Sequence, residues 1–259
     1  MMVTPKIQLI GTWTLIKKEL IRFWRVAFQT VAAPVITGIL YLVIFSHVLQ
    51  DRLEVYEGVT YTSFLIPGLI MMSLLQNAFA NTSSSILISK VQGNIVDVLM
   101  PPLSEYELTF SYSLGGVTRG LLVGLSVSIV IYLIVPIQIT NLFIIIYFAL
   151  FSSLLLSLLG ILCGIWAKKF DHMASVTNFI ILPLTFLSGT FYSIERLPED
   201  WRFFAYLNPF FYIIDGFRYG FVGVSDSNIS LGIFILAIAN LIFLILTIYI
   251  FKKGYGLRN

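Results

Sequence analysis

The chain has 259 residues, of which 58% are hydrophobic and 11% are charged, and its formal net charge is +3. Its mean hydropathy is +0.93. A soluble domain carries roughly a quarter charged residues, so this composition excludes an ordinary soluble protein and indicates a chain surrounded mainly by lipid. The length accommodates about six spans of ~20 residues and leaves no stretch for a sizeable soluble domain. The single cysteine, Cys163, excludes an internal disulfide framework.

The N-terminal segment, residues 1–25, combines apolar and basic residues at helical spacing. Its apolar positions are Leu9, Trp13, Ile16, Leu20 and Phe23. Lys17, Lys18 and Arg22 occupy the other faces, together with Glu19. This pattern predicts a basic amphipathic helix that lies along the membrane and leads into the first span. A charged flank that only sets the topology would use the same residues.

Six apolar stretches predict an all-α integral membrane protein with one transmembrane domain over residues 1–259. The expected spans are residues 26–48, 60–80, 109–135, 142–167, 173–190 and 231–251. Polar residues within or beside these spans must face a partner helix or a wet path, because lipid does not solvate them. They are Gln76, Asn77, Asn81, Arg119, Thr177, Asn178 and Asn240. We take them as pathway candidates, although hydrogen bonding between helices is the commoner role for each one alone.

Arg119 is the most demanding of these residues. It stands some ten residues inside the third expected span, which places it about 15 Å deep at ~1.5 Å rise per residue. A guanidinium at that depth needs a carboxylate, carbonyl groups or water. Two interpretations stay open: Arg119 belongs to a wet or gated path, or it extends to the cytoplasmic headgroups. Beside it, Gly116, Gly120 and Gly124 recur every four residues and predict close approach of another helix.

The segment at residues 86–107 predicts a short amphipathic helix between spans two and three. Its apolar face holds Val91, Ile95, Val98 and Leu99. Pro101 and Pro102 end that helix, and Ser104 with Glu107 three residues on has the pattern of a capping box that opens the next helix. We expect this helix to lie in water with an apolar edge that a partner can receive. The alternative is a membrane-surface helix without a partner.

Residues 191–223 are too aromatic for an ordinary loop and too charged for a simple span. Glu199 and Asp200 after Pro198 suit the first turn of one helix, and Asn208-Pro209 predicts a turn into a second. We therefore expect a re-entrant hairpin of two short helices with its rings at headgroup depth. Its marked positions are Pro198, Trp201, Asn208, Pro209, Asp215 and Arg218. A loop with a few anchoring aromatic residues is the alternative.

The basic residues predict the orientation. With both termini cytoplasmic, eleven of the sixteen Lys and Arg residues fall inside, four fall outside and Arg119 lies within the membrane. This asymmetry places the segment at 86–107 in the cytoplasm and the hairpin on the outer face. All acidic residues fall in loops or flanks, so the expected spans contain no carboxylate.

Sequence motifs for enzymatic chemistry are missing. The chain has no GxxxxGK[ST] phosphate loop, so it cannot bind ATP by that route, and no GxSxG, HExxH or CxxC motif. Its two histidines, His47 and His172, fall on opposite sides of the expected membrane and cannot share a metal or a catalytic site. We therefore expect a protein that is not an enzyme and carries no metal or cofactor.

Three stretches together resemble a known family. They are GNIVDVLMPPLSEYE at 93–107, GGVTRGLLVG at 115–124, and LSGTFYSIERLPEDWRFFAYLNPFFYIIDGFRYGFVG at 187–223. Their order and spacing, with the basic helix before span one, resemble the ABC-2 type permeases. These are the membrane-spanning subunits of bacterial ABC exporters, which include polysaccharide, lipo-oligosaccharide and drug export permeases.

The resemblance implies partners and roles. It implies six spans, a homodimer in the bacterial cytoplasmic (inner) membrane, and two copies of a separate ABC ATPase that hold the Mg-ATP; no nucleic acid is involved. The short helix after span two would seat in the ATPase, the pre-span helix around Lys17, Lys18 and Arg22 would also touch it, and the outer hairpin would line or close the exit. The seated residues would be Val91, Gly93, Ile95, Asp97 and Leu99.

Two other classes of function stay open. An ion-coupled secondary carrier acting without an ATPase usually needs buried carboxylates, which the expected spans lack. A membrane assembly scaffold is compatible with the same residues. The sequence identifies no substrate, because an aromatic outer segment can stack on sugars, contact lipid tails or anchor the fold.

Overall fold

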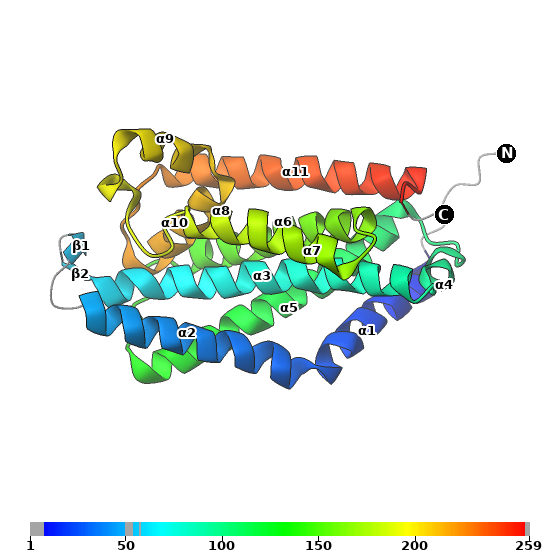
Figure 1. The fold of residues 1–259 in the computed structure, drawn as a ribbon, viewed down its shortest axis with the longest axis horizontal. Helices are drawn as coiled ribbons and strands as arrows, with labels where there is room; N and C mark the ends of the chain where they lie inside the picture. Colours follow the sequence, from blue (N-terminus) through cyan, green and yellow to red (C-terminus); the bar gives the residue numbers. More distant parts are fainter. Residues whose placement is uncertain (1–7, 50–53, 57, 257–259) are drawn as a thin grey trace.

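The computed structural model describes residues 8–49, 54–56 and 58–256, and the elements form an elongated helical bundle (Figure 1). Within those residues, five helices are long and apolar enough to cross a membrane. They are α2 (Ala27–Leu49), α3 (Tyr61–Val91), α5 (Glu105–Ile134), α6 (Leu142–Trp166) and α11 (Ile229–Lys253). Each of the five corresponds to an expected span. Five charged residues lie outside the described residues: Lys6, Asp51, Arg52, Glu57 and Arg258.

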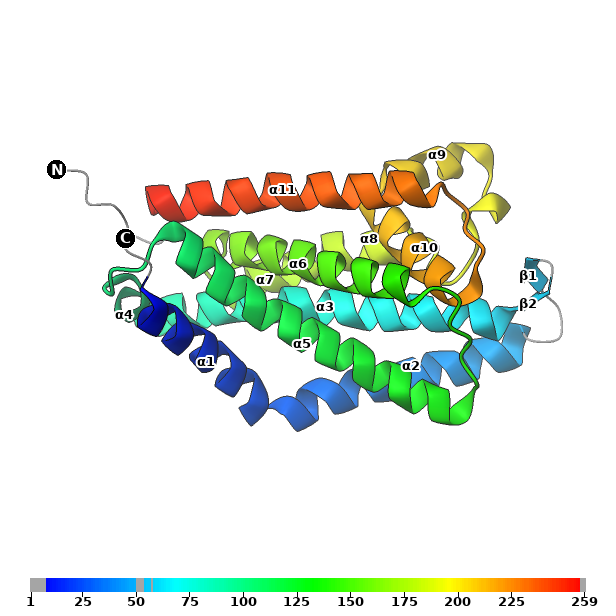
Figure 2. The ribbon, with the colours of Figure 1, turned by 180° about the vertical axis from the view of Figure 1, so that it is seen from behind.

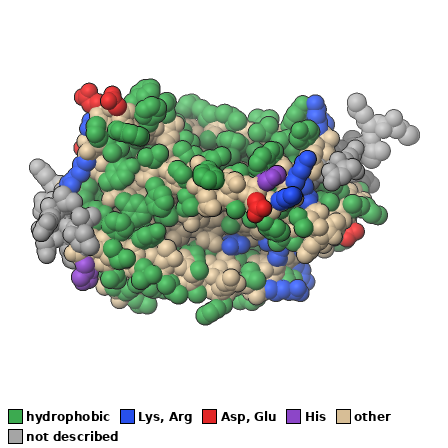
Figure 3. Space-filling view, in the orientation of Figure 1, with side chains coloured by type: hydrophobic (Ala, Val, Ile, Leu, Met, Phe, Trp, Pro, Cys, Tyr) green, Lys and Arg blue, Asp and Glu red, His purple; other side chains and the backbone are tan. Residues whose placement is uncertain are grey.

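The shorter elements gather at the two ends of the bundle. At one end lie α4 (Ile95–Leu99) and the start of α1 (Leu9–Arg25), and at the other lie the strands β1 (Glu54–Tyr56) and β2 (Val59–Thr60), which pair antiparallel. The helix α9 (Glu199–Leu207) and the 3₁₀ turn η2 (Ile194–Arg196) share that second end. Figure 3 shows hydrophobic side chains over the length of the molecule, with charged side chains mostly toward its ends.

The helix α3 forms the centre of the bundle and packs against α5, α6, α2 and α10 (Pro209–Val222). Phe64, Leu65 and Leu75 along it are fully buried. Because other helices rather than lipid surround α3, it also accommodates buried polar residues such as Asn81 and Ser85. By contrast, α2 exposes large apolar side chains along its length, as expected of a helix that faces lipid or another protein.

The glycines of α5 allow the close packing that their spacing predicts. A Cβ atom placed on Gly120 would lie 2.9 Å from the Cβ of Ala78, and one on Gly116 would lie 2.7 Å from Cγ2 of Thr82. Both neighbours belong to α3, so this prediction is confirmed. On α6, Gly160 faces the same helix, since its added Cβ would lie 2.5 Å from the carbonyl oxygen of Phe79.

The second expected span and the segment at 86–107 need correction. The helix α3 continues without a break to Val91, eleven residues past the expected end at residue 80, so residues 86–91 belong to a membrane helix. Hydropathy misplaces this end because the polar residues after Ala80 are covered by α1, α5 and α6 rather than by water. The separate amphipathic helix is α4, which has only five residues.

The expected span at 173–190 has a different construction. Three consecutive pieces form one helical run: α7 (Phe170–Val176), the π-helical η1 (Thr177–Ile181) and α8 (Leu182–Phe186). The π turn ends two residues before Pro183, whose nitrogen has no amide hydrogen to donate and whose ring disturbs regular helix. Residues 187–190 form a turn in which Gly189 has φ +74°. This run is not one of the five long helices.

The segment that we expected to form a hairpin contains two helices. The first, α9, begins directly after Pro198, and the second, α10, begins at Pro209. Asn208 caps α10, because its Oδ1 accepts a hydrogen bond of 3.0 Å from the amide of Phe210. The two helices lie in different surroundings: α9 exposes Trp201 and other rings, whereas most of α10 is buried among α3, α6 and α11.

Candidate functional site

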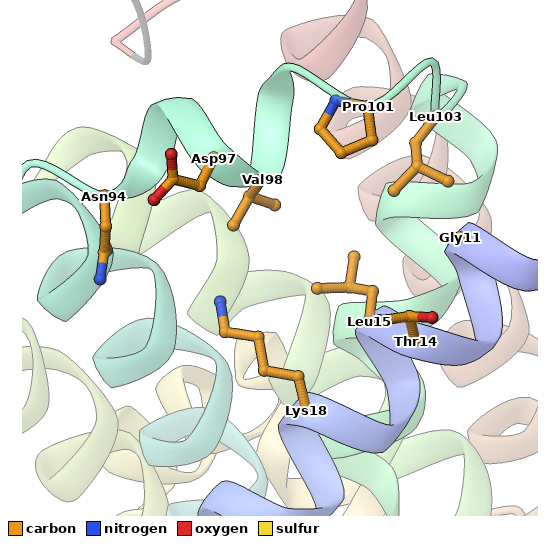
Figure 4. Close-up of a pocket in the computed structure, with 9 residues that line it drawn as sticks. All are labelled: Gly11, Thr14, Leu15, Lys18, Asn94, Asp97, Val98, Pro101 and Leu103. Carbon is orange, nitrogen blue, oxygen red and sulfur yellow. The ribbon is translucent and has the colours of Figure 1, made fainter.

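A groove separates α1 from α4 at the end of the bundle that holds the start of α1 (Figure 4). Its volume is about 380 Å³. It is lined by Gly11, Thr14, Leu15, Lys18, Asn94, Asp97, Val98, Pro101 and Leu103. The close-up shows Lys18 extending from α1 toward α4, with Leu15 and Val98 facing one another across the gap.

The groove has an apolar floor and a charged rim. Leu15 and Val98 are buried at 5% and 8% exposure, while the Lys18, Asn94 and Asp97 side chains are exposed. Such an arrangement is typical of a protein-binding surface, where an apolar centre is surrounded by polar groups. Gly93 makes the turn that enters α4 with φ +76°, a conformation that side chains other than glycine rarely adopt.

The capping box fixes the other end of the connection from α4. Ser104 accepts a hydrogen bond from the amide of Glu107, and Glu107 accepts one of 2.7 Å from the amide of Ser104, as predicted. The second carboxylate oxygen of Glu107 accepts hydrogen bonds from the Gln8 amide and from Thr12. One side chain therefore joins the start of α1 to the start of α5.

The expected apolar edge of the short helix mostly points inward, which corrects the sequence interpretation. Ile95 is only 9% exposed and packs with Val98 and Leu108 in a core cluster, with Leu99 partly buried against it. The chain itself therefore uses the face that we expected a partner to receive. Val91, Gly93 and Asp97 remain exposed, as a contact surface requires.

Two exposed apolar residues near the groove were not predicted from the sequence. Val96 and Met100 are 54% and 75% exposed and stand four positions apart, so they share a helical face directed away from the core. Their spacing is visible in the sequence, but a larger apolar set on the opposite face obscured it.

The helix α1 also differs from its predicted pattern. Leu15, Ile16, Glu19 and Phe23 are buried, while Trp13 is 62% exposed. Lys17 and Lys18 are exposed as expected. In Figure 2, α1 runs beside the first half of α5 and meets α2 at an angle, so its inner face is covered by protein.

A polar joint connects α1 to α3. Arg22 forms an ion pair with Glu19 and donates to both the backbone oxygen and the side-chain oxygen of Asn81, at 2.8 and 2.9 Å. Glu19 accepts a hydrogen bond of 2.7 Å from Ser85. Arg22, which we expected to contact a partner, and Asn81, a pathway candidate, therefore serve contacts within the chain.

Arg119 meets an amide rather than a carboxylate. Its Nε and Nη2 atoms lie 3.3 and 3.1 Å from Oδ1 of Asn77. The helix α5 begins at Glu105, so Arg119 stands fourteen residues along it, or about 21 Å at ~1.5 Å per residue. The structure thus brings two pathway candidates, Arg119 and Asn77, together.

Gln76, next to this pair, lines a cavity of about 220 Å³ between α2 and α3. Thr37 and Tyr41 from α2 and Ser73 from α3 also line it. The Nε2 atom of Gln76 has no hydrogen-bond partner among the described residues, although it is buried. A buried amide needs a partner, so this cavity is suited to water or to a polar ligand group.

The remaining pathway candidates lie elsewhere. Asn240 is buried and donates to the carbonyls of Phe151 and Leu236, which makes it a helix-to-helix contact. Thr177 bonds the carbonyl of Met173 within its own helical run. Asn178 is exposed on the π turn.

The end of the bundle opposite the groove holds a hydrogen-bonded network around two carboxylates. Asp215 is fully buried, which corrects the expectation that all acidic residues stay in loops, and it accepts from the amides of Asp226 and Ser227 at 2.9 and 3.0 Å. Arg218 is also buried; it donates to the Phe64 carbonyl at 3.2 Å, and its guanidinium carbon lies 3.7 Å from the centre of the Phe64 ring.

Asp226 and Tyr56 complete this network, and neither was singled out from the sequence. Asp226 accepts hydrogen bonds from Tyr56, Ser193 and the amide of Ile194, at 2.5, 2.8 and 2.9 Å. Burial, together with Asp226, raises the pKa of Tyr56 above its ordinary value, so the phenol remains a donor. No local pattern could have shown a contact between residues 170 positions apart.

These features define an integral membrane protein with a groove at one end and a polar seam in its interior. Among the described residues, no group of three or more His, Cys, Asp and Glu side chains could hold a metal ion. The sequence profile of the ABC-2 type transporter family matches residues 11–222. The chain therefore belongs to the ABC-2 type transporter family.

Named relatives agree with this assignment. The inner membrane transport permease YadH of Escherichia coli K12 is 38% identical over 242 residues, which cover 93% of this chain and 94% of that protein. The protein of the same name from Shigella flexneri matches to the same extent. Nodulation protein J of Rhizobium leguminosarum bv. viciae is 23% identical over 184 residues, or 70% of this chain and 71% of that protein. These similarities support a membrane transport permease.

Proposed function

We propose that this chain is the permease subunit of an ABC exporter in the bacterial inner membrane, driven by a separate ATPase that holds the Mg-ATP. The α1–α4 groove carries this proposal. It offers an apolar floor, a rim with both signs of charge, and two exposed apolar side chains, Val96 and Met100, beside it. The ATPase would dock there, with Lys17, Lys18, Val91, Gly93 and Asp97 at the contact.

The contacts of α1 with α3 and α5 explain how a movement of the docked ATPase would reach the membrane-spanning helices. The ion pair of Arg22 with Glu19 ties α1 to α3 through Asn81, and Glu107 ties α1 to the start of α5. Since α3 and α5 are the central helices, a displacement of α1 or α4 would act on both. Arg119 and Asn77 bridge the same two helices farther along.

The proposal includes a dimer and six membrane-crossing segments, with the run from α7 to α8 as the sixth. Asn178 on that run and Thr37 on α2 are exposed polar side chains that lipid would solvate poorly. A second copy would cover these faces and form the path between the two chains, near Gln76. In this arrangement α9 and α10 stand at the outer exit.

The test is co-purification with candidate ABC ATPases from the same genome, expressed with the chain in membranes. Asp97→Lys reverses a rim charge of the groove, and Asp171→Lys reverses another exposed acid of the same end outside the groove. We expect Asp97→Lys to reduce both ATPase retention and export, with Asp171→Lys unchanged. If Asp97→Lys retains the ATPase and exports normally, the docking assignment is wrong; transport by the purified chain without an ATPase would favour a carrier.

A further inference from the structure

A second cavity, of about 580 Å³, lies at the same end of the bundle as the groove. It opens between the last turns of α3 and α6 and the turn that follows α11. Its volume falls within the ~300–1,000 Å³ that is usual for small-molecule sites. It shares no lining residue with the α1–α4 groove, and of its lining residues only Val91 belongs to the ATPase contact proposed above.

One wall of this cavity carries a fixed positive charge. Lys90, near the end of α3, extends across to α6 and donates to the carbonyl oxygens of Ile165 and, at 2.8 Å, Ala167. These carbonyls belong to the C-terminus of α6, where no further backbone amide of the helix can donate a hydrogen bond to them. The ammonium group therefore caps the negative end of a helix and is held in place there.

A second, free positive charge comes from Lys168. Its side chain is exposed and lines the cavity. Within the part of the chain that the structure describes, no carboxylate lines the cavity, and no ion pair within 4.0 Å joins Lys168 to the exposed Asp171 of α7. Figure 3 shows Lys and Arg side chains gathered at this end of the molecule. The cavity is therefore positively charged and open to an anion.

Two amphipathic rings stand at the rim. Trp166 is 59% exposed and Tyr255 is 73% exposed, and both line the cavity. Exposed tryptophan and tyrosine at the ends of spans are typical of the boundary between hydrocarbon and water. The cavity thus lies at headgroup depth, and the large exposed side chains of the spans below it can accommodate acyl chains.

We propose that this cavity binds the phosphate headgroup of an anionic phospholipid from the cytoplasmic leaflet. Basic pockets between the cytoplasmic ends of spans are suited to such headgroups. A lipid fits better than a free phosphate, because the opening is wide and the rim rings would contact glycerol and acyl carbons. It also fits better than an acidic segment of a partner protein, which would not require rings at the membrane boundary.

The experiment compares two neighbouring lysines in the purified full chain. Lys168→Gln removes the free charge of the cavity, and Lys169→Gln removes an exposed charge that does not line it. Native mass spectrometry measures retained lipid after addition of phosphatidylglycerol, phosphatidylcholine or soluble glycerol phosphate. We expect the wild type to retain phosphatidylglycerol selectively, Lys168→Gln to retain about fivefold less, and Lys169→Gln to match the wild type.

Several outcomes would overturn the proposal. Equal losses in the two variants would mean general surface attraction, and equal retention of phosphatidylcholine would mean that the headgroup charge is not recognised. Displacement of the lipid by an equal concentration of glycerol phosphate would assign the site to a free anion. Displacement by an ATPase subunit would assign it to that protein. Elution volume and melting temperature without lipid, measured for both variants, verify that each one folds.

Discussion

Arg22 and Glu19 form an ion pair of 3.0 Å in which the Glu19 side chain is fully buried and that of Arg22 is 27% exposed. Few charges of the chain lie so far from water, and the pair occupies the contact between the amphipathic helix and the central helix. Asn81 and Ser85 complete its hydrogen bonds. A buried charge requires such compensation, so the orientation of α1 on α3 depends on both partners.

Replacing Glu19 with Ala should therefore destabilise the chain by about 3 kcal/mol, the lower end of the range for breaking a buried pair, because Arg22 keeps Asn81 and some water. The unfolding midpoint of the purified protein in detergent measures this loss. Lys18→Ala, on the exposed side of the same helix, should change stability by less than about 0.5 kcal/mol. Equal effects of the two substitutions would show that the pair does not stabilise the joint.

Replacing Asn77 with Leu should cost more than replacing both Asn77 and Arg119 with Leu. The single substitution leaves a guanidinium in the bundle without its acceptor, and hydrogen bonds to charged groups contribute about 1.5–3 kcal/mol. The double substitution also removes the guanidinium of Arg119, so no buried charge is left without an acceptor. Melting curves of the single and double variants test this order, and the reverse order would show that Arg119 finds water or another partner there.

Replacing Gly160 with Ala should destabilise the contact between α6 and α3 by about 1–3 kcal/mol, the usual cost of overpacking. The added methyl group would meet the backbone oxygen of Phe79 at 2.5 Å, and backbone cannot move aside as a flexible side chain can. Gly38→Ala on α2 is the matched control, because its nearest neighbour would be Val127 at 3.5 Å. A gain in stability in both variants would mean that the higher helix propensity of alanine, rather than packing, decides.

The sequence was sufficient for the elements whose signals are local. Long stretches of high hydropathy predicted five long helices. The turn between α9 and α10 was predicted from Asn208-Pro209, and the start of α5 was predicted from Ser104 with Glu107. In each case the residues that specify the feature lie within a few positions of one another. Pairing between distant segments left no such signal, as for Tyr56 and Asp226.

The errors have a common physical cause. Hydropathy assumes that lipid or water surrounds a helix, yet α3 is surrounded by other helices, so its polar run from Asn81 to Ser85 did not end it. The same limit affected α4 and α1. The sequence shows that Ile95 is apolar and that Glu19 is charged. It does not show whether this chain or another one covers either side chain.

Replacing Asp226 with Ala should loosen the end of the bundle around η2. The amide of Ile194 loses its acceptor at 2.9 Å, and since a hydrogen bond to a charged group contributes about 1.5–3 kcal/mol, its hydrogen exchange should accelerate by roughly tenfold or more. Asp200→Ala on the exposed first turn of α9 should leave that amide unchanged. The raised pKa of Tyr56 keeps its phenol protonated across about pH 5 to 9. The difference in Ile194 exchange between the two variants should therefore persist over that pH range, after correction for the intrinsic exchange rate. Unchanged protection of Ile194 in Asp226→Ala would show that the carboxylate does not hold the outer hairpin.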